Sequence, residues 1–486
     1  MLHREMRLVL DLVVNHTSDE HPWFEEARKS RHNPYYNYYH WWPAEKGEPP
    51  LRLSYFDEEG NAWTYNKSTD SYYLHYFSRK QPDLNWENPE VRQEIFDMMR
   101  FWFDKGIDGF RMDSISLIAK DPSFPLIDSK KYPDIFSFYA KEPRLHLYLH
   151  EMNRQVLSKY DCMSVGEGSA VMVDDVAKFV DPAREELNML YHFDAARIRN
   201  TTLPDNPESG IDYSLIALKK MFTEWDKAVD KGWPSIYLGN HDQPRMVSRF
   251  GSDKDEFRAL SAKMLITFLL TMRGTPYWFA GDEIGMRNIR FDRIEDYNDI
   301  DTINRYKKAK AEGKDPQAVL DEQKETGRDN ARTPFQWDRS PEAGFTAGTP
   351  WLKVNPDYTW INVADEEKDP TSILNYFKKV VSFRKENPSL IYGSYHLLDA
   401  ENPQSYTFLR KTGADTYLIM LNFSPKAAIS TPGIDMSNAH VLLDNYGDRS
   451  HMAPQKDITL RPFEAIVFQL NHPVYESFID SLDLLE

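Results

Sequence analysis

The sequence predicts an α/β protein built on a parallel β/α barrel and followed by an antiparallel β-domain. Short runs of Val, Leu and Ile alternate with amphipathic helical patterns between residues 7 and 386, which is typical of parallel βαβ units. Acidic residues follow several of these runs, where the active sites of barrels are built. From about residue 394 the pattern changes to alternating apolar and polar residues separated by turns, which indicates antiparallel strands.

Composition limits the class of protein. The 486 residues suffice for two or three domains, and an aromatic content of 14% excludes a disordered chain and suits stacking on sugar rings. A net charge of −17 disfavours nucleic acid, and the sequence has no apolar run long enough to span a membrane. A single cysteine, Cys162, and the lack of a signal peptide predict a cytoplasmic protein. We expect a monomer that acts on a small molecule and binds neither nucleic acid nor a membrane.

The first predicted strand covers residues 7–14 and is followed by Asn15 and His16. Its run of Val and Leu is typical of a strand that is buried on both faces. Residues 17–87 have no regular period and are rich in Tyr and Trp. Because loops of this length are uncommon in compact domains, we expect an inserted subdomain here.

A helix is predicted to begin after Asn88, a good N-cap residue, with Pro89 at its first position. Its apolar stripe is expected to consist of Val91, Ile95, Met98 and Trp102. Further strands are predicted at 107–113, 162–166, 187–193, 235–239 and 275–280, with helices between them and a last helix at about 370–386. Period-2 runs at 405–410, 416–422, 439–444 and 463–469 predict the C-terminal strands.

The predicted strands and helices make six β/α units, whereas a closed (β/α)8 barrel needs eight. Because the first strand lies close to Met1, we expect a TIM barrel that lacks its first two units and contains strands three to eight. The predicted domains are a partial barrel (1–16 and 88–393), an inserted subdomain (17–87) and a C-terminal β-sandwich (394–486). An open doubly wound sheet is the alternative, and it would need no missing units.

Asp113, Glu167 and Asp242 are placed at the ends of three different predicted strands. Hydrolysis of a glycosidic bond with retention needs one carboxylate that attacks the anomeric carbon and one carboxylic acid that protonates the leaving oxygen. Arg111, two residues before Asp113 on the same strand face, would keep that carboxylate ionised. The apolar run before Glu167 would favour its protonated form.

Each of these residues also has a structural interpretation. An aspartate after a strand is often a turn former or a helix cap, and Arg111 with Asp113 could be a structural ion pair. His16 follows a further strand, and His241 follows the same strand as Asp242. Both histidines could bind sugar hydroxyls, although His241 could also be a core histidine. The coincidence of carboxylates, an arginine and histidines at the strand ends of one predicted barrel favours a site.

The segments around these residues resemble, in order, the conserved regions of the α-amylase superfamily of glycoside hydrolases (family 13). Within it they are most similar to the oligo-1,6-glucosidase and α-glucosidase group. The matching segments are Asp11–His16 (DLVVNH), Gln81–Asn85 (QPDLN), Gly109–Asp113 (GFRMD), Met163–Glu167 (MSVGE), Asn240–Asp242 (NHD) and Gly327–Asp338 (GRDNARTPFQWD).

The resemblance implies a role for each matching residue. Asp113 would be the nucleophile, Glu167 the acid and base, and Asp242 the group that stabilises the transition state. The substrate-binding residues that it implies are His16, Phe77, Arg111, His241 and Arg332, with Arg328 as an alternative to Arg332. It implies no cofactor. We predict no metal site, because the family's first loop, which often holds a metal ion, belongs to the part expected to be missing.

The resemblance implies an exo-acting α-glucosidase that hydrolyses terminal α-1,6 or α-1,4 bonds of short gluco-oligosaccharides. Two departures leave the bond preference open: Ser114 stands where α-1,6-preferring relatives usually have Val, and residues 168–170 read Gly-Ser-Ala instead of Met-Pro-Gly. The alternatives are a sucrose or maltose isomerase with the same residues, a non-catalytic relative such as a transporter heavy chain, and an inactive fragment. Residues 290–306 resemble the hydrolases more than the arginine-rich loop of sucrose isomerases.

Overall fold

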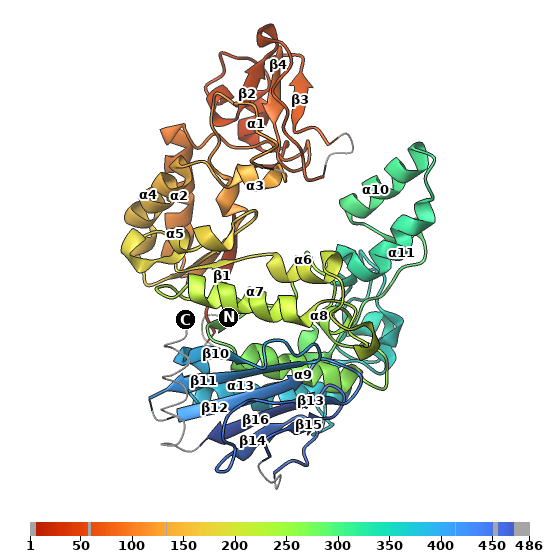
Figure 1. Ribbon diagram of the computed structural model, residues 1–486. Coiled ribbons are helices and arrows are strands. Elements are labelled where there is room, and N and C mark those ends of the chain that lie inside the picture. The colour runs from red at the N-terminus through yellow and green to blue at the C-terminus, as the bar shows by residue number, and fades with distance from the viewer. Residues whose placement is uncertain (1–5, 57–59, 133, 414, 451–454, 471–486) are drawn as a thin grey trace. The chain divides into compact units, whose positions relative to one another are not determined.

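The computed structural model describes residues 6–56, 60–132, 134–413, 415–450 and 455–470 (Figure 1). Residues 471–486 of the predicted C-terminal domain lie outside this range. The chain divides into two compact units, Met1–Phe193 with Ala228–Pro234, and Asp194–Lys227 with Ser235–Glu486. The predicted domain boundaries divide the chain differently and stay predictions.

The first unit is organised around a parallel sheet of four strands in the order β1-β5-β6-β7. The strands are β1 (Val9–Val13), β5 (Gly109–Asp113), β6 (Met163–Glu167) and β7 (Met189–Tyr191). They confirm the first four predicted strands and their parallel direction. The register pairs Asp11 with Arg111 and Glu167 with Tyr191. Polar side chains from neighbouring strands therefore lie side by side near the carboxyl end of this sheet.

The helices of the first unit include α2 and α4, whose positions were predicted. The helices are α1 (Pro22–Ala27), α2 (Pro89–Asp104), α3 (Phe136–Tyr139), α4 (Arg144–Gln155) and α5 (Ala177–Val180). The predicted stripe of α2 was partly wrong, because Met98 is half-buried and Trp102 is 41% exposed. Phe96, Met99 and Phe103 are buried instead. This helix is apolar over a wide arc, so its packing partners decide which residues it buries.

An antiparallel sheet of three strands lies within residues 17–87, in the order β2-β4-β3. Its strands are β2 (Trp41–Pro43), β3 (Trp63–Asn66) and β4 (Ser71–Leu74). The core beside this sheet includes Leu117, Phe124 and Tyr139 from the segment after β5, and the Tyr139 ring stacks on that of Tyr76 with centroids 3.9 Å apart. The aromatic residues of this segment thus form a core that also draws on later residues. The extent of the predicted subdomain stays a prediction.

The second unit contains the last two predicted parallel strands, which are shorter than expected. They are β8 (Ser235–Ile236) and β9 (Thr275–Pro276), and they pair with each other. The helices are α6 (Asp194–Thr201), α7 (Leu215–Ala228), α8 (Met246–Phe250), α9 (Arg258–Thr271), α10 (Ile300–Ala311), α11 (Pro316–Thr326), α12 (Val363–Glu366), α13 (Ile373–Glu386) and α14 (Ser389–Tyr392). Of these, α7, α9 and α13 were predicted. α10 and α11 lie between the predicted strand at 275–280 and the predicted helix at about 370–386, in a polar segment for which no helix was predicted, although Asp315 and Pro316 are a typical helix start.

The C-terminal part of the second unit is antiparallel, as predicted. Five strands have the order β10-β11-β12-β16-β14, and β13 pairs with β15 (Figure 1). Their bounds are β10 (Ser394–Leu398), β11 (Ser405–Thr412), β12 (Asp415–Asn422), β13 (Ala428–Ser430), β14 (His440–Asp444), β15 (Ile458–Leu460) and β16 (Ala465–Leu470). Leu418 and Phe468 share one buried core with Ile458, so residues of both sheets contribute to it. Within the described part of the chain, no helix has the length and apolar character needed to cross a membrane.

Candidate active site

Arg111 lies at the centre of a polar cluster in the first unit. Its Nη1 donates to Oδ1 of Asp113 at 2.8 Å and to Oδ1 of Asp11 at 2.9 Å. Its Nη2 donates to Oε2 of Glu167, and its Nε donates to the hydroxyl of Tyr191 at 2.9 Å. One guanidinium therefore binds three carboxylates and one phenol. We call this group the Arg111 cluster; its members are Asp11, Arg111, Asp113, Glu167 and Tyr191.

The sheet brings these side chains together in two ways. Arg111 and Asp113 point to the same face because side chains two apart in a strand share a face, and Asp11 stands beside Arg111 in the register of β1 and β5. Burial lowers the pKa of Arg111, but Glu167, Tyr191 and Asp113 raise it above its ordinary value. The guanidinium therefore stays charged. Its contact with Asp113 was predicted, whereas its contact with Glu167 was not.

Glu167 is the buried carboxylate of the cluster, with 6% of its surface exposed. Its Oε1 accepts from the hydroxyl of Ser169 at 3.1 Å, and its Oε2 accepts from the backbone N–H of Ser114 at 3.3 Å. Ser114 has a φ of 44°, in the left-handed region that residues other than glycine seldom adopt. This conformation turns the N–H of the residue after Asp113 towards Glu167, so hydrogen bonds hold both oxygens of the carboxylate.

His16 and Phe77, the two other predicted residues of the first unit, lie against each other. Their ring centroids are 5.2 Å apart, and the His16 Nε2 is 3.0 Å from the side-chain nitrogen of Gln81. Burial lowers the pKa of His16, and it outweighs the opposite effects of Asp83 and Asp113. A neutral histidine beside an aromatic ring offers one polar edge and one apolar face, which suits a sugar ring.

Lys120 supports the segment that carries His16 and was not identified from the sequence. It is fully buried, its Nζ donates to Oδ1 of Asn15 at 2.6 Å, and it lies 3.0 Å from Oδ2 of Asp83. Asn15 precedes His16, and Asp83 belongs to the matching segment Gln81–Asn85. One buried ion pair thus joins two of the sequence regions that resemble the family. The residue lacked a sequence signal because its partners are distant along the chain.

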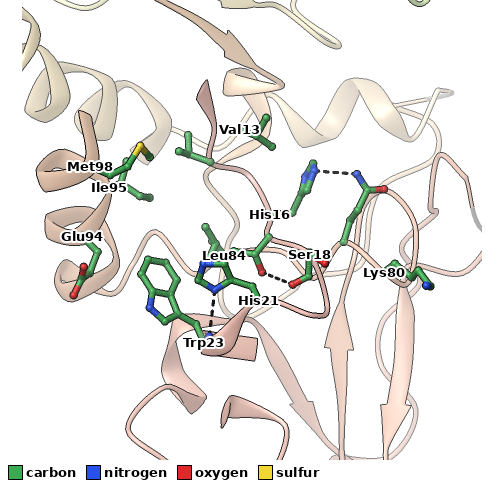
Figure 2. A pocket seen from close by; sticks show the side chains of 13 residues that line it. Val13, His16, Ser18, His21, Trp23, Lys80, Leu84, Glu94, Ile95 and Met98 are labelled. Atoms are coloured by element: carbon green, nitrogen blue, oxygen red, sulfur yellow. Dashed lines mark hydrogen bonds between the residues drawn. The ribbon is translucent and has the colours of Figure 1, made fainter. Parts of the chain in front are cut away.

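A pocket of about 620 Å³ adjoins His16. Figure 2 shows His16 and Lys80 on one side of it, and Glu94, Ile95 and Met98 of α2 on the other. The volume lies within the range of small-molecule pockets. Of the predicted site residues in the first unit, only His16 lines this pocket, and the carboxylates of the Arg111 cluster do not.

The second unit holds the remaining predicted residues in a cluster of its own. Oδ1 of Asp242 accepts from Nη2 of Arg332 at 2.7 Å and from Nη1 of Arg328 at 3.4 Å. Oδ2 of Asp242 lies 3.2 Å from Nε2 of His241, whose backbone carbonyl accepts from Nε of Arg332 at 2.7 Å. Arg328 also donates to Asp299. We call this group the Asp242 cluster; its members are His241, Asp242, Asp299, Arg328 and Arg332.

The segment before Asp242 is a loop and not the end of a strand, which corrects the prediction for 235–239. β8 ends at Ile236, and Asn240 Oδ1 accepts from the backbone N–H of Asp242 at 2.8 Å, which is the turn that an asparagine side chain favours. Asp299 was not predicted. It caps the start of α10 by accepting from the N–H of Thr302 at 3.2 Å, and its other oxygen binds Arg328. Its signal was the N-cap pattern before α10.

The comparisons with known proteins agree with the motifs. The family model described as "Alpha amylase, catalytic domain" matches residues 1–393. The chain is 49% identical over 484 residues to an oligo-1,6-glucosidase from Parageobacillus thermoglucosidasius, covering 97% of this chain and 84% of that protein. It is 40% identical over 479 residues to a trehalose-6-phosphate hydrolase from Bacillus subtilis, covering 97% of this chain and 83% of that protein. A solved structure of an isomaltulose synthase mutant from Erwinia rhapontici with its natural substrate sucrose matches with a TM-score of 0.90 and 40% identity, over 96% of this chain and 84% of that chain.

The chain therefore belongs to the alpha-amylase family of glycoside hydrolases. The family match and the structural likeness confirm an alpha-amylase catalytic domain of the TIM-barrel class followed by an antiparallel β-domain. The absence of two barrel units and the bounds of the inserted subdomain stay predictions, as do the roles of the individual site residues.

Proposed function

We propose that this protein is a retaining α-glucosidase that hydrolyses terminal α-1,6 or α-1,4 bonds of short gluco-oligosaccharides. The observation that carries the proposal is the pair of carboxylates on one guanidinium. Nη1 of Arg111 binds Asp113 and Nη2 binds Glu167, so the two carboxylates are held close together. Retaining glycosidases need a separation of roughly 5–5.5 Å, which leaves no room for a water molecule between the carboxylate and the anomeric carbon.

The reaction proceeds in two displacements. Asp113 attacks the anomeric carbon while Glu167 gives its proton to the leaving glycosidic oxygen, which yields a glucosyl ester on Asp113 and frees the alcohol. Glu167 then removes a proton from water, the resulting oxygen attacks the anomeric carbon, and Asp113 leaves. Glucose is released with its original α configuration, and both carboxyl groups return to their starting states.

The exposure of the two side chains supports this division of roles. The side chain of Asp113 is 23% exposed and that of Glu167 is 8% exposed. A nucleophile must reach the sugar as a carboxylate, whereas burial favours the neutral form that a general acid needs. Arg111 remains charged throughout and balances the negative charge that moves between the two groups.

The Asp242 cluster is assigned its role from the sequence resemblance and its own geometry. Two arginines donate to one oxygen of Asp242, which fixes the position of this carboxylate. A fixed negative charge suits stabilisation of an oxocarbenium-like transition state and does not suit proton transfer. His241 and Arg332 would bind sugar hydroxyls beside it.

The substrate class follows from the relatives. They are named as oligo-1,6-glucosidases and, at 39% identity, as an α-glucosidase from Pediococcus pentosaceus. His16 and Phe77 supply a polar edge and an aromatic face for a terminal glucose. We further propose that the protein acts as a monomer in the cytoplasm.

An isomerase is the second proposal that the comparisons favour. The solved structure of isomaltulose synthase matches with a TM-score of 0.90. Such an enzyme would use the same nucleophile and acid, but the released fructose or glucose would attack the intermediate in place of water. The two activities therefore differ in their products and not in their first step.

Product analysis tests the proposal. Purified protein is incubated with isomaltose, maltose and sucrose, and free glucose, free fructose and rearranged disaccharides are quantified. We expect free glucose from isomaltose or maltose. From an aryl α-glucoside, whose leaving group is not a sugar, we expect glucose to be released first as the α anomer in an NMR time course. Release of the β anomer from the aryl α-glucoside would refute retention, and a rearranged disaccharide formed from sucrose without free glucose would favour the isomerase.

A further inference from the structure

Ser169 lies in the loop that leaves β6, two residues after Glu167. Its hydroxyl donates to Oε1 of Glu167 at 3.1 Å. The other oxygen, Oε2, accepts from Nη2 of Arg111 and from the backbone N–H of Ser114 at 3.3 Å. The two oxygens of the carboxylate therefore face different kinds of hydrogen-bonding group.

The difference decides which oxygen carries the proton. A guanidinium and a backbone N–H are donors only, so Oε2 keeps its lone pairs towards Arg111 and Ser114. A proton on Glu167 is therefore carried by Oε1, the oxygen that contacts Ser169. A hydroxyl both donates and accepts, so Ser169 can remain bonded to Oε1 whether Glu167 is ionised or protonated.

The backbone holds Ser169 in this position. Its carbonyl accepts from the hydroxyl of Ser116, a fully buried residue, at 2.6 Å. The next residue, Ala170, has a φ of 61°, which is rare for a residue other than glycine. The side chain of Ser169 is thus bonded to Glu167, and its backbone carbonyl is bonded to Ser116.

Gly168 fastens the same loop to β7. Its N–H donates to the carbonyl of Tyr191 at 2.9 Å. A Cβ built on Gly168 would lie 2.4 Å from Cδ2 of Leu190 and 2.9 Å from that carbonyl, so a side chain does not fit here. The close packing of this residue leaves Ser169 little freedom to move away from Glu167.

We propose that Ser169 is a positioning residue for proton transfer by Glu167. Its hydroxyl orients Oε1, the oxygen that gives a proton to the leaving group and later takes one from water. The proposal rests on the proposed function, in which Glu167 is the acid and base.

The charged groups around Glu167 define what the test must hold constant. Arg111 and Asp113 belong to β5. Asp11 of β1 and the phenol of Tyr191 of β7 both accept hydrogen bonds from Arg111. All of them remain when Ser169 is replaced, so a difference between the wild-type protein and the variant reports the hydroxyl.

The test compares Ser169→Ala with Ser169→Thr, which keeps a hydroxyl, and with Ser158→Ala, an exposed serine whose hydroxyl donates to the backbone carbonyl of Arg154 at 3.3 Å. The value of kcat/KM is measured for isomaltose and for 2,4-dinitrophenyl α-glucoside over a range of pH. The disaccharide needs a proton on its leaving oxygen, whereas dinitrophenolate leaves without one.

We expect Ser169→Ala to lower kcat/KM for the disaccharide by about ten-fold, as the loss of one hydrogen bond to a charged group predicts. The loss should be much smaller for the dinitrophenyl glucoside. The alkaline limb of the pH profile should move to higher pH, because the ionised form of Glu167 loses a donor. Ser169→Thr should restore both properties, and Ser158→Ala should change neither. If the alanine variant does not fold, Ser169→Gly replaces it.

Equal losses on the two substrates with an unmoved alkaline limb would overturn the inference, because a purely structural role has this effect. No change in Ser169→Ala would overturn it as well. Glu167→Ala separates this failure from that of the proposed function. If Glu167→Ala cleaves the disaccharide as well as the wild-type protein does, or if the wild-type protein cleaves neither substrate, the proposed function fails and the inference fails with it.

Discussion

The Arg111 cluster and the Asp242 cluster balance their charges in opposite ways. One guanidinium serves three carboxylates in the first, whereas two guanidinium groups donate to a single oxygen of Asp242 in the second. A carboxylate that shares its arginine loses less electrostatic stabilisation when it is protonated or esterified than one that holds two arginines. The Arg111 cluster is therefore the better place for a carboxylate that forms a covalent bond, and the Asp242 cluster is the better place for one that keeps its negative charge.

The strongest test of this comparison is Asp113→Asn. An amide cannot form the glucosyl ester, so we expect kcat/KM for an aryl α-glucoside to fall by about 10⁴-fold or more. The substitution keeps the size of the side chain, and the thermal unfolding temperature should stay close to that of the wild-type protein.

Asp11→Asn is the matched control, because this carboxylate binds the same nitrogen of Arg111 but its side chain is 62% exposed. We expect less than about a ten-fold change in kcat/KM for the control, as is usual for an exposed ion pair. A similar loss in both variants, or substantial residual turnover in Asp113→Asn, would mean that Asp113 has no special role within the cluster.

Arg111→Lys tests whether the first cluster depends on a single cation. A lysine is a point charge and cannot fork between Asp113 and Glu167, so we expect kcat/KM to fall by roughly 10²- to 10³-fold. Arg111 also binds the Tyr191 hydroxyl, so the thermal unfolding temperature should fall as well. Kinetics and unfolding of the same preparation check both effects. Near-normal turnover would show that the carboxylates do not need the shared guanidinium.

The sequence predicted the strands of the first unit well because each is a short apolar run between clear breaks. The final polar residue of such a run points to the site without knowledge of the fold, which is how Asp113 and Glu167 were identified. The contact between Arg111 and Glu167 depends on which strands are neighbours and on their register. The sequence shows neither the order of the strands nor their register, and Arg111 and Glu167 are 56 positions apart in it.

The second unit was harder to predict from its sequence. The parallel pair β8 and β9 is only two residues long in each strand, so most of each predicted strand is loop. Asp299 and Arg328 meet only because α10 and the segment that follows α11 return to the same place. Motifs could identify Asp242, Arg328 and Arg332, but no local pattern encodes the contacts of the two arginines with Asp242.

Arg332→Lys should have a smaller effect than Arg111→Lys, because Arg328 still donates to the same oxygen of Asp242. We expect about a ten-fold rise in KM with a modest fall in kcat, since a lost charged hydrogen bond is replaced in part by the lysine. Steady-state kinetics of the two lysine variants on one substrate give the comparison. An effect of Arg332→Lys as large as that of Arg111→Lys would remove the distinction between the two clusters.

The smallest expected effect concerns His16. If this histidine were protonated, a second positive charge besides Arg111 would act on Asp113. Burial lowers the pKa of His16 below its ordinary value of 6.5, so the folded protein binds a proton here less readily than the unfolded chain. The unfolded chain therefore binds more protons between the lowered pKa and pH 6.5, and this histidine costs stability as the pH falls through that window. Above pH 6.5 the histidine is neutral in both states and the cost is absent.

Urea unfolding of the wild-type protein and His16→Gln at pH 7.5, 6.0 and 5.0 measures this cost. Glutamine does not titrate, so the stability of the variant relative to the wild-type protein should improve as the pH falls. Ser158→Ala, at an exposed position without a titratable side chain, is the control and should show no such trend. A relative stability that is constant with pH, or one that worsens on acidification, would mean that His16 accepts a proton in the fold. A second cation would then lie near Asp113, and the charge balance around the Arg111 cluster would approach that of the Asp242 cluster.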